Sequence, residues 1–268
     1  MSFDASAGRL RCPFCGSERL EQQADKKVLS PTRVVPFVID QDQALARMRS
    51  WLRGGIWRPS NLSQQAAVVS ISAVYVPYWV FQAQTHTFWT ADTDQVPYGA
   101  RGDWYPLTGE HHGRYSGLLV GASGVLTPRE TSAICPFDLD AGVPPGQLDL
   151  DNVIVEDFSI ARKYARPQAR QGLEAREVQT CRQQYVPGRS RHVKVNVRVE
   201  GLSSEPVLLP VWMLAYRYRQ KTYRFLMNGQ TGQSTGTAPV TYTKVGIIAA
   251  ALAVAVLLLL LVLLSLLR

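Results

Sequence analysis

Residues 68–89 read VVSISAVYVPYWVFQAQTHTFW, and this stretch decides the class of fold. Its first half is rich in β-branched residues, which fit the pleated surface of a strand. Beyond Pro77 the side chains alternate, and one of the two alternating sets is much more apolar than the other. Such a period of two is typical of a strand that is buried on one face. We expect a long strand here, with Pro77 at a sheet edge or a bulge, followed by loops with short strand pieces over residues 90–117.

A second stretch of the sequence repeats the form of the first. Val76-Pro77-Tyr78-Trp79 has a counterpart in Leu209-Pro210-Val211-Trp212, and each leads into an aromatic-rich strand. Either the chain contains an internal duplication, or Pro and Trp coincide in two unrelated strands. We expect an α+β fold with a mainly antiparallel β body, on which helices pack. The residues expected to hold this body together are Trp79, Trp212, Asn228 and Gly229.

Two helices are expected beside the strands. Asp40 and Gln43 have the spacing of a capping box, apolar residues follow at helical intervals, and Gly54-Gly55 ends the pattern. A longer helix is expected over residues 159–184, interrupted or bent near Pro167.

The composition excludes several classes of protein. Hydrophobic residues make up 46% of the 268 residues and charged residues 19%, so the chain is neither wholly disordered nor a coiled coil. Four cysteines in this length are too few for a secreted scaffold held by disulfides. They are expected to be thiols or metal ligands in a reducing compartment.

Residues 246–267 form a long apolar run. The run holds 22 residues without a charge, nearly all of them Leu, Val, Ala or Ile. A helix of this length reaches roughly 33 Å, which is enough to cross the hydrocarbon core of a bilayer. The run has no polar face, whereas a core helix of this length keeps one. The sequence therefore predicts a C-terminal transmembrane anchor.

The distribution of charge predicts how the chain is oriented. Lys244 and a basic body precede the apolar run, and basic segments stay in the cytoplasm. We expect a single-pass protein of the inner (cytoplasmic) membrane with its body in the cytoplasm. Three parts are expected: a degenerate zinc-knuckle head over residues 1–35, an α+β body over residues 36–244, and the anchor over residues 245–268.

The net charge of +8 is concentrated in residues 161–200, where bases outnumber acids. The basic residues singled out on the helical part of this stretch are Arg162, Lys163, Arg166, Arg170, Arg176 and Arg182. Such a surface is either plainly solvated or attracted to anionic lipids beside the anchor, where each base contributes about 1 kcal/mol. Nucleic acid is a further alternative, but aromatic residues are sparse among these bases. The last alternative is that this surface binds an acidic protein partner.

Cys12-Pro13-Phe14-Cys15-Gly16 has the form of a zinc knuckle. Two thiolates on a tight turn supply two ligands, whereas a structural zinc ion needs four. Ser30-Pro31-Thr32-Arg33 stands where a second knuckle would be, with both sulfurs replaced. Cys135 and Cys181, or the knuckle of a second chain in a homo-oligomer, could complete the site. The alternative is a degenerate knuckle that binds no metal.

No motif in the sequence predicts catalysis. Residues 232–236 match the G-x-S-x-G pattern around Ser234, but Thr237-Ala238-Pro239 follows where a nucleophile elbow needs a helix. His111 and His112 are expected on an exposed loop, with their side chains pointing apart. A phosphate-binding loop and a dinucleotide-binding motif are also missing from the sequence. The chain is therefore expected to be non-enzymatic.

Several motifs together resemble a family of bacterial membrane-anchored zinc-ribbon proteins of poorly defined role, often labelled primosomal or helicase-like. They are Val35-Pro36-Phe37, Tyr75-Val76-Pro77-Tyr78-Trp79-Val80-Phe81, Pro136-Phe137-Asp138-Leu139 and, most specifically, the stretch from Leu209 to Lys244. The family's usual head has two Cys-x-x-Cys knuckles, of which this chain keeps Cys12 and Cys15. The helicase label has no support in these residues, because no phosphate-binding loop is present.

The resemblance implies a membrane adaptor or scaffold that works with band-7 (flotillin-like) proteins in envelope-stress responses. The alternative function is a zinc-ribbon protein that is tethered to the membrane and binds nucleic acid. That alternative predicts binding that falls steeply with salt concentration.

Overall fold

The computed structural model describes residues 29–55, 57–151, 153–241 and 256. The expected zinc knuckle with Cys12 and Cys15 lies outside these described residues. The expected anchor over residues 246–267 does so too, apart from Val256. Within the described ranges, no helix is long and apolar enough to span a membrane.

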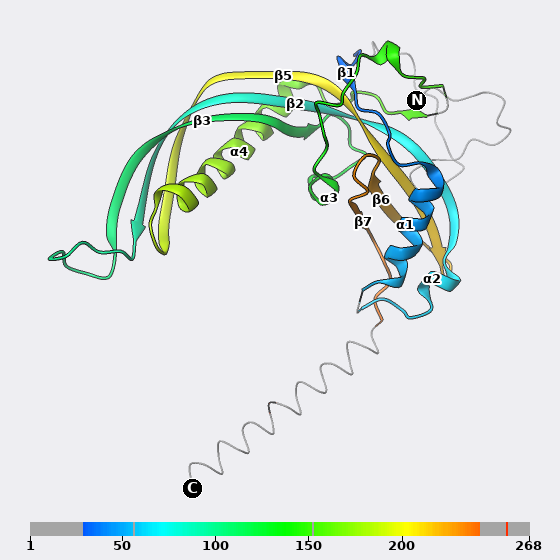
Figure 1. The fold of residues 1–268 in the computed structure, drawn as a ribbon, viewed down its shortest axis with the longest axis horizontal. Helices are drawn as coiled ribbons and strands as arrows, with labels where there is room; N and C mark the ends of the chain where they lie inside the picture. Colours follow the sequence, from blue (N-terminus) through cyan, green and yellow to red (C-terminus); the bar gives the residue numbers. More distant parts are fainter. Residues whose placement is uncertain (1–28, 56, 152, 242–255, 257–268) are drawn as a thin grey trace, which may run out of the picture.

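One sheet of seven strands forms the body of the protein. Its strands are β1 (Arg33–Val34), β2 (Ala67–Thr93), β3 (Tyr105–Gly121), β4 (Ile154–Val155), β5 (Ser190–Tyr218), β6 (Lys221–Asn228) and β7 (Ser234–Gly236). The order across the sheet is β3-β2-β5-β6-β7, and all of these neighbours are antiparallel. The short strands β1 and β4 pair in parallel with β5 and β2. Figure 1 shows the long strands bent into an arch.

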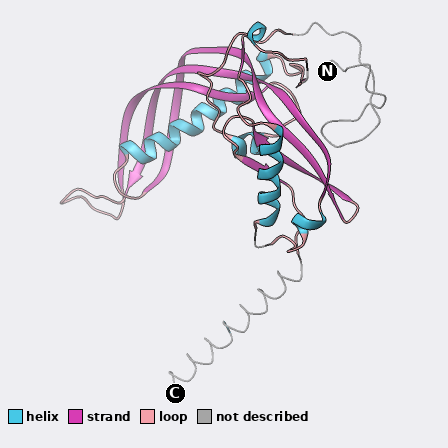
Figure 2. Cartoon of the chain, turned by 45° about the vertical axis from the view of Figure 1, so that its right-hand side comes forward, coloured by secondary structure: helices cyan, strands magenta, loops and turns pink. Residues whose placement is uncertain are grey.

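Helices lie against both limbs of the arch, so the fold is α+β with a mainly antiparallel sheet, as expected (Figures 1 and 2). They are α1 (Gln41–Arg53), α2 (Leu62–Gln65), α3 (Pro128–Ile134), a 3₁₀ turn (Pro145–Gln147), α4 (Arg162–Thr180) and a π-helical turn (Cys181–Tyr185). The capping box of Asp40 and Gln43 and the end of α1 at Gly54 are present as expected. α4 begins at Arg162, and the π-helical turn extends it to Tyr185, close to the expected span of residues 159–184. The helix is not interrupted at Pro167, contrary to one form of the expectation.

The expectation of loops with short strand pieces over residues 90–117 is correct only for residues 94–104. β2 continues to Thr93, and β3 pairs with it from Tyr105 onward. The glycines of this segment are typical of loops, but Gly109 packs against Trp89, and a Cβ at Gly109 would come within 2.6 Å of the indole ring. A glycine is needed there because the large ring across the strand pair leaves no room for a side chain.

Pro77 lies at neither a sheet edge nor a bulge, because β2 has a neighbour on both sides of this region. Its ring nitrogen faces the gap between β4, which pairs with β2 as far as Tyr75, and β3, which pairs with it from Tyr78. On that side the Pro77 carbonyl accepts a hydrogen bond from the N–H of Ala122, at 2.9 Å. The change of neighbour explains why a residue without an N–H donor is tolerated in the middle of a sheet.

β5 has the same arrangement around Pro210. β1 pairs with it as far as Leu208, and β6 pairs with it from Val211. The Pro210 carbonyl accepts a hydrogen bond from the N–H of Gly229, at 2.9 Å. The two long strands are thus equivalent around their prolines.

This equivalence extends to the helices. Trp79 donates from Nε1 to the carbonyl of Ile160, and Trp212 donates from Nε1 to the carbonyl of Ile39, both at 2.8 Å. Ile39 precedes the N-cap of α1, and Ile160 precedes the N-cap of α4. The chain therefore contains two units of the same order, β1-α1-β2-β3 and β4-α4-β5-β6. The helix of each unit packs on the strands of the other.

Aromatic and apolar contacts follow the same pattern. Phe37 packs edge-on against Trp212 with 5.3 Å between ring centres, and Phe158 packs edge-on against Trp79 at 5.7 Å. The buried positions on the two helices have matching spacing: Ala44, Met48 and Leu52 on α1, and Ala165, Ala169 and Leu173 on α4.

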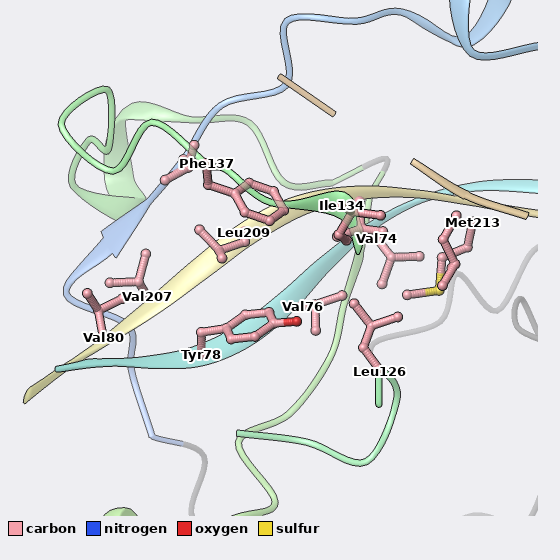
Figure 3. Packing of buried hydrophobic residues seen from close by; sticks show 13 residues of the cluster. Val74, Val76, Tyr78, Val80, Leu126, Ile134, Phe137, Val207, Leu209 and Met213 are labelled. Atoms are coloured by element: carbon pink, nitrogen blue, oxygen red, sulfur yellow. The ribbon is translucent and has the colours of Figure 1, made fainter. Parts of the chain in front are cut away.

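The central core lies where the two prolines bring β2 and β5 together. Val76 and Tyr78 point to one face of the sheet, where they pack with Ile134 and its neighbours (Figure 3). Trp79 belongs to the other face, beneath α4. Because both faces are covered, every residue from Val74 to Phe81 is buried, so the alternation of apolar and polar residues is lost in this part of β2.

Replacing either Trp79 or Trp212 with Phe is expected to lower the free energy of unfolding by roughly 1–3 kcal/mol. Each change leaves a main-chain carbonyl without its indole donor. Trp57→Phe is the control, because Trp57 is exposed, and it should change stability by less than about 0.5 kcal/mol. Denaturation of the full chain in detergent, followed by circular dichroism, measures the differences. A loss at only one of the two positions would contradict the equivalence of the units.

Candidate functional site

The basic residues singled out from the sequence lie on the exposed side of α4 and on the turn after it. Ala165, Ala169 and Leu173 face the sheet and are buried, so the bases between them point away from it. All six are exposed: Arg162, Lys163, Arg166, Arg170, Arg176 and Arg182. We call this surface the basic face of α4.

A groove with a volume of about 990 Å³ runs beside β3, between α3 and α4. We call it the α3–α4 groove. Its floor is residues 117–121, one wall is Gln168, Gln171, Gly172 and Arg176 of α4, and the other wall includes Pro128, Thr131, Ser132, Cys135 and Phe137. Arg176 is the one charged residue of this lining, and it also belongs to the basic face of α4. The lining is otherwise apolar or neutral.

α4 also buries a carboxylate against the sheet. Glu177 is fully buried, and its Oε1 accepts a hydrogen bond from the hydroxyl of Thr85 on β2. Its Oε2 lies 3.7 Å from Nε2 of His111 on β3, whose Nδ1 is 2.8 Å from the hydroxyl of Tyr185. Burial raises the pKa of the neighbouring Tyr115 to about 12. We call Thr85, His111, Glu177 and Tyr185 the Glu177 cluster.

The Glu177 cluster joins α4 to the two strands beneath it. A buried carboxylate is costly unless it is paired and hydrogen-bonded. In this cluster Thr85 donates to Oε1, whereas Oε2 has no hydrogen bond and lies near the His111 ring. The cluster therefore fixes the position of α4, and with it one wall of the α3–α4 groove.

The expectation that His111 lies on an exposed loop is wrong, because its side chain on β3 is only 14% exposed. His112 does point the other way, and it stacks on His86 with 4.0 Å between ring centres. Sequence reasoning missed the contact between His111 and Glu177 because it joins a strand to a distant helix. The signal that could have placed His111 on a strand is the alternation of residue types across residues 105–117.

The remaining chemical candidates among the described residues are not gathered into a site. Among the described residues, no group of three or more His, Cys, Asp and Glu side chains is placed to hold a metal ion. Burial raises the pKa of Cys135, and it raises the pKa of Cys181 to about 11, so without a bound metal both are thiols at neutral pH. Ser234 begins the strand β7, whereas a nucleophile elbow lies between a strand and a helix.

Asn228 and Gly229 connect β6 to the segment after α3. Nδ2 of Asn228 donates to the carbonyls of Ile134 and Pro136, at 2.9 and 2.8 Å. Its Oδ1 accepts two backbone N–H groups of the turn that follows. A Cβ at Gly229 would come within 2.5 Å of the ring of Phe37, so this position has no room for a side chain. The two residues therefore fix one end of the loop that forms the second wall of the groove.

Comparison with known proteins finds similarity to an uncharacterized protein. No family model matches the chain, and no solved structure matches it. The chain is similar to the uncharacterized protein YdjG of Bacillus subtilis (strain 168), with 26% identity over 230 residues. The match covers 81% of this chain and 66% of YdjG, so the chain spans about two thirds of the length of that relative.

Glu177→Ala is expected to lower the free energy of unfolding by roughly 2–4 kcal/mol. The change leaves a cavity and removes the carboxylate that Thr85 and His111 contact in a buried site. Glu174→Ala is the matched control, because Glu174 lies nearly one turn earlier on α4 and is exposed. Thermal unfolding of the full chain in detergent compares the two. Equally small effects would show that the cluster does not hold α4 in place.

Proposed function

We propose that the protein is a non-enzymatic adaptor that recruits a protein partner at the cytoplasmic side of the inner membrane. The observation that carries this proposal is the α3–α4 groove, which is open, mainly neutral and bordered by the edge of a sheet. Grooves and sheet edges of this kind are surfaces on which peptide segments of other proteins dock.

The basic face of α4 supports a position beside the bilayer. In the proposal, residues 246–267 anchor the chain, and the body lies close to the headgroups. Exposed bases near an anionic surface contribute about 1 kcal/mol each. Tyr164, which lies beside Lys163 at 4.9 Å, is one of few aromatic residues among these bases, and this composition favours lipid over nucleic acid.

The partner that the sequence resemblance suggests is a band-7 (flotillin-like) protein in an envelope-stress complex.

We also propose that the two β-α-β-β units arose by internal duplication. The matched hydrogen bonds of Trp79 and Trp212 support this origin. Two interlocked copies make a firm scaffold, which suits an adaptor.

Purification of the full chain from its native host in mild detergent tests the proposal. The adaptor is expected to bring down a membrane-associated protein in stoichiometric amount, identified by mass spectrometry, with an absorbance ratio that shows no nucleic acid. A quadruple variant with Gln at positions Arg162, Lys163, Arg166 and Arg170 should keep this partner. Arg101→Gln, an exposed base outside the basic face, is the control for loss of charge alone.

The opposite result would favour the zinc-ribbon alternative. In that case nucleic acid elutes from the purified chain as salt is raised, the quadruple variant loses it, and no protein partner is found. This outcome would refute the adaptor function.

A further inference from the structure

β7 covers the outer edge of β6 in one of the two units. The pairs are Phe225 with Gly236, Leu226 with Thr235 and Met227 with Ser234. The ladder continues at one end from the N–H of Thr237 to the carbonyl of Arg224, at 2.9 Å. At the other end, the N–H of Asn228 donates to the carbonyl of Gln233, at 2.8 Å. Because bonding alternates along a strand, Leu226 also directs its N–H and C=O toward β7.

β3 is the equivalent of β6 in the other unit. Trp79 of β2 pairs with Val120 of β3. In the same way, Trp212 of β5 pairs with Met227 of β6. The positions that match across the units are Leu118, Leu119 and Val120 of β3, and Phe225, Leu226 and Met227 of β6.

The outer edge of β3 carries no strand among the described residues, because β3 ends the order of the sheet. This edge is instead the floor of the α3–α4 groove. The N–H of Ala122 bonds inward, to Pro77, so Leu119 and Gly121 direct their N–H and C=O groups outward. These outward groups face the groove at the place that β7 occupies in the other unit.

A difference between the two helices opens the groove. Trp51 of α1 packs edge-on against Phe225 with 5.2 Å between ring centres. It also closes the space beside β7, since a Cβ at Gly236 would lie 3.0 Å from the Trp51 ring. The corresponding position of α4 is Gly172, where a Cβ would lie 3.3 Å from Leu118. Gly172 stands where α1 has Trp51, so the space over Leu118 is open. A strand at this edge could carry a side chain there, whereas β7 has Gly236 at the equivalent position.

We propose that an extended segment of the partner protein adds to the edge of β3 as an antiparallel strand and occupies the α3–α4 groove. The inference rests on the proposed adaptor function and names its docking site. The segment bonds to Leu119 and Gly121, and the residue opposite Leu118 places a large apolar side chain over Gly172. β7 of a second copy does not meet this description, because it has Gly236 at that position.

Charge at the end of the groove adds a second element of recognition. Successive turns of α1 approach Gly232 and then Gly236, so β7 and α1 run in the same direction. A segment that binds as β7 does therefore runs along α4 from Gly172 toward Arg176. One helical turn spans about 5.4 Å, which is roughly two residues of a strand. In the other unit, the same step of one helical turn separates Gly232 from Gly236. The segment is thus apolar opposite Leu118 and acidic two to four positions later.

A displayed library of random seven-residue peptides, selected on the full chain in detergent, tests this inference. Gly172→Trp supplies the side chain that closes the space in the other unit, and it serves for counter-selection. Glu174→Trp is the matched control, since Glu174 is exposed on α4 and is not part of the groove lining. Selected peptides should carry an apolar residue followed two to four positions later by an acidic one. Their affinity should fall about tenfold or more on Gly172→Trp and stay unchanged on Glu174→Trp.

Hydrogen exchange supplies an independent readout. A selected peptide is expected to slow exchange of the Leu119 and Gly121 amides, because strand addition engages both. Leu119→Pro removes an N–H that points into the groove, so this edge substitution should also abolish binding. It replaces Gly172→Trp as the blocking variant if the tryptophan prevents folding.

Three results would overturn the inference. The first is a failure to select any peptide that Gly172→Trp excludes, and the second is binding without protection of the two amides. The third is protection of these amides in the chain alone, which would assign the groove to another segment of this chain or to a second copy. The peptide assay contains no partner protein, so failure here leaves recruitment through another surface intact. A chain that binds such peptides but recruits no protein refutes only the adaptor function.

Discussion

The pairing of β2 with β5 is the constraint on which the rest of the structure depends. The two strands stay paired from Ala67 opposite Arg217 to Thr93 opposite Ser190, and each contains a proline that lacks an N–H for its outer neighbour. That neighbour must therefore change at the proline. On one side β4 gives way to β3, and on the other β1 gives way to β6.

The tryptophan after each proline then joins the two units. Trp79 and Trp212 bond to residues that immediately precede the helix caps of the opposite unit. Each helix consequently buries its apolar side against strands from elsewhere in the chain. Neither unit has a complete core by itself, because the side chains that cover its strands belong to its counterpart. The body is held together by this exchange.

The two units keep the same frame but differ at their outer edges. One edge is closed by β7 and by Trp51, whereas the other has Gly172 over Leu118 and an open groove. α4, which carries Gly172, also has the basic face on its outer side and the buried Glu177 on its inner side. One half of the pseudo-symmetric frame is thus filled by the chain itself, and the other half keeps an open groove, which we propose as the docking site of a partner.

The sequence by itself determined the class of fold, the capped helix α1 and the Pro–Trp recurrence, because these depend on local spacing, capping and turn chemistry. It also placed six bases on one helical segment. Only the tertiary structure decided that Pro77 lies within the sheet, that residues 105–121 form a strand, and that His111 meets Glu177. These features depend on contacts between segments far apart in the chain, such as Gly109 against Trp89. The α3–α4 groove is another such feature. It forms where Gly172 of α4 and the outer edge of β3 come together in space.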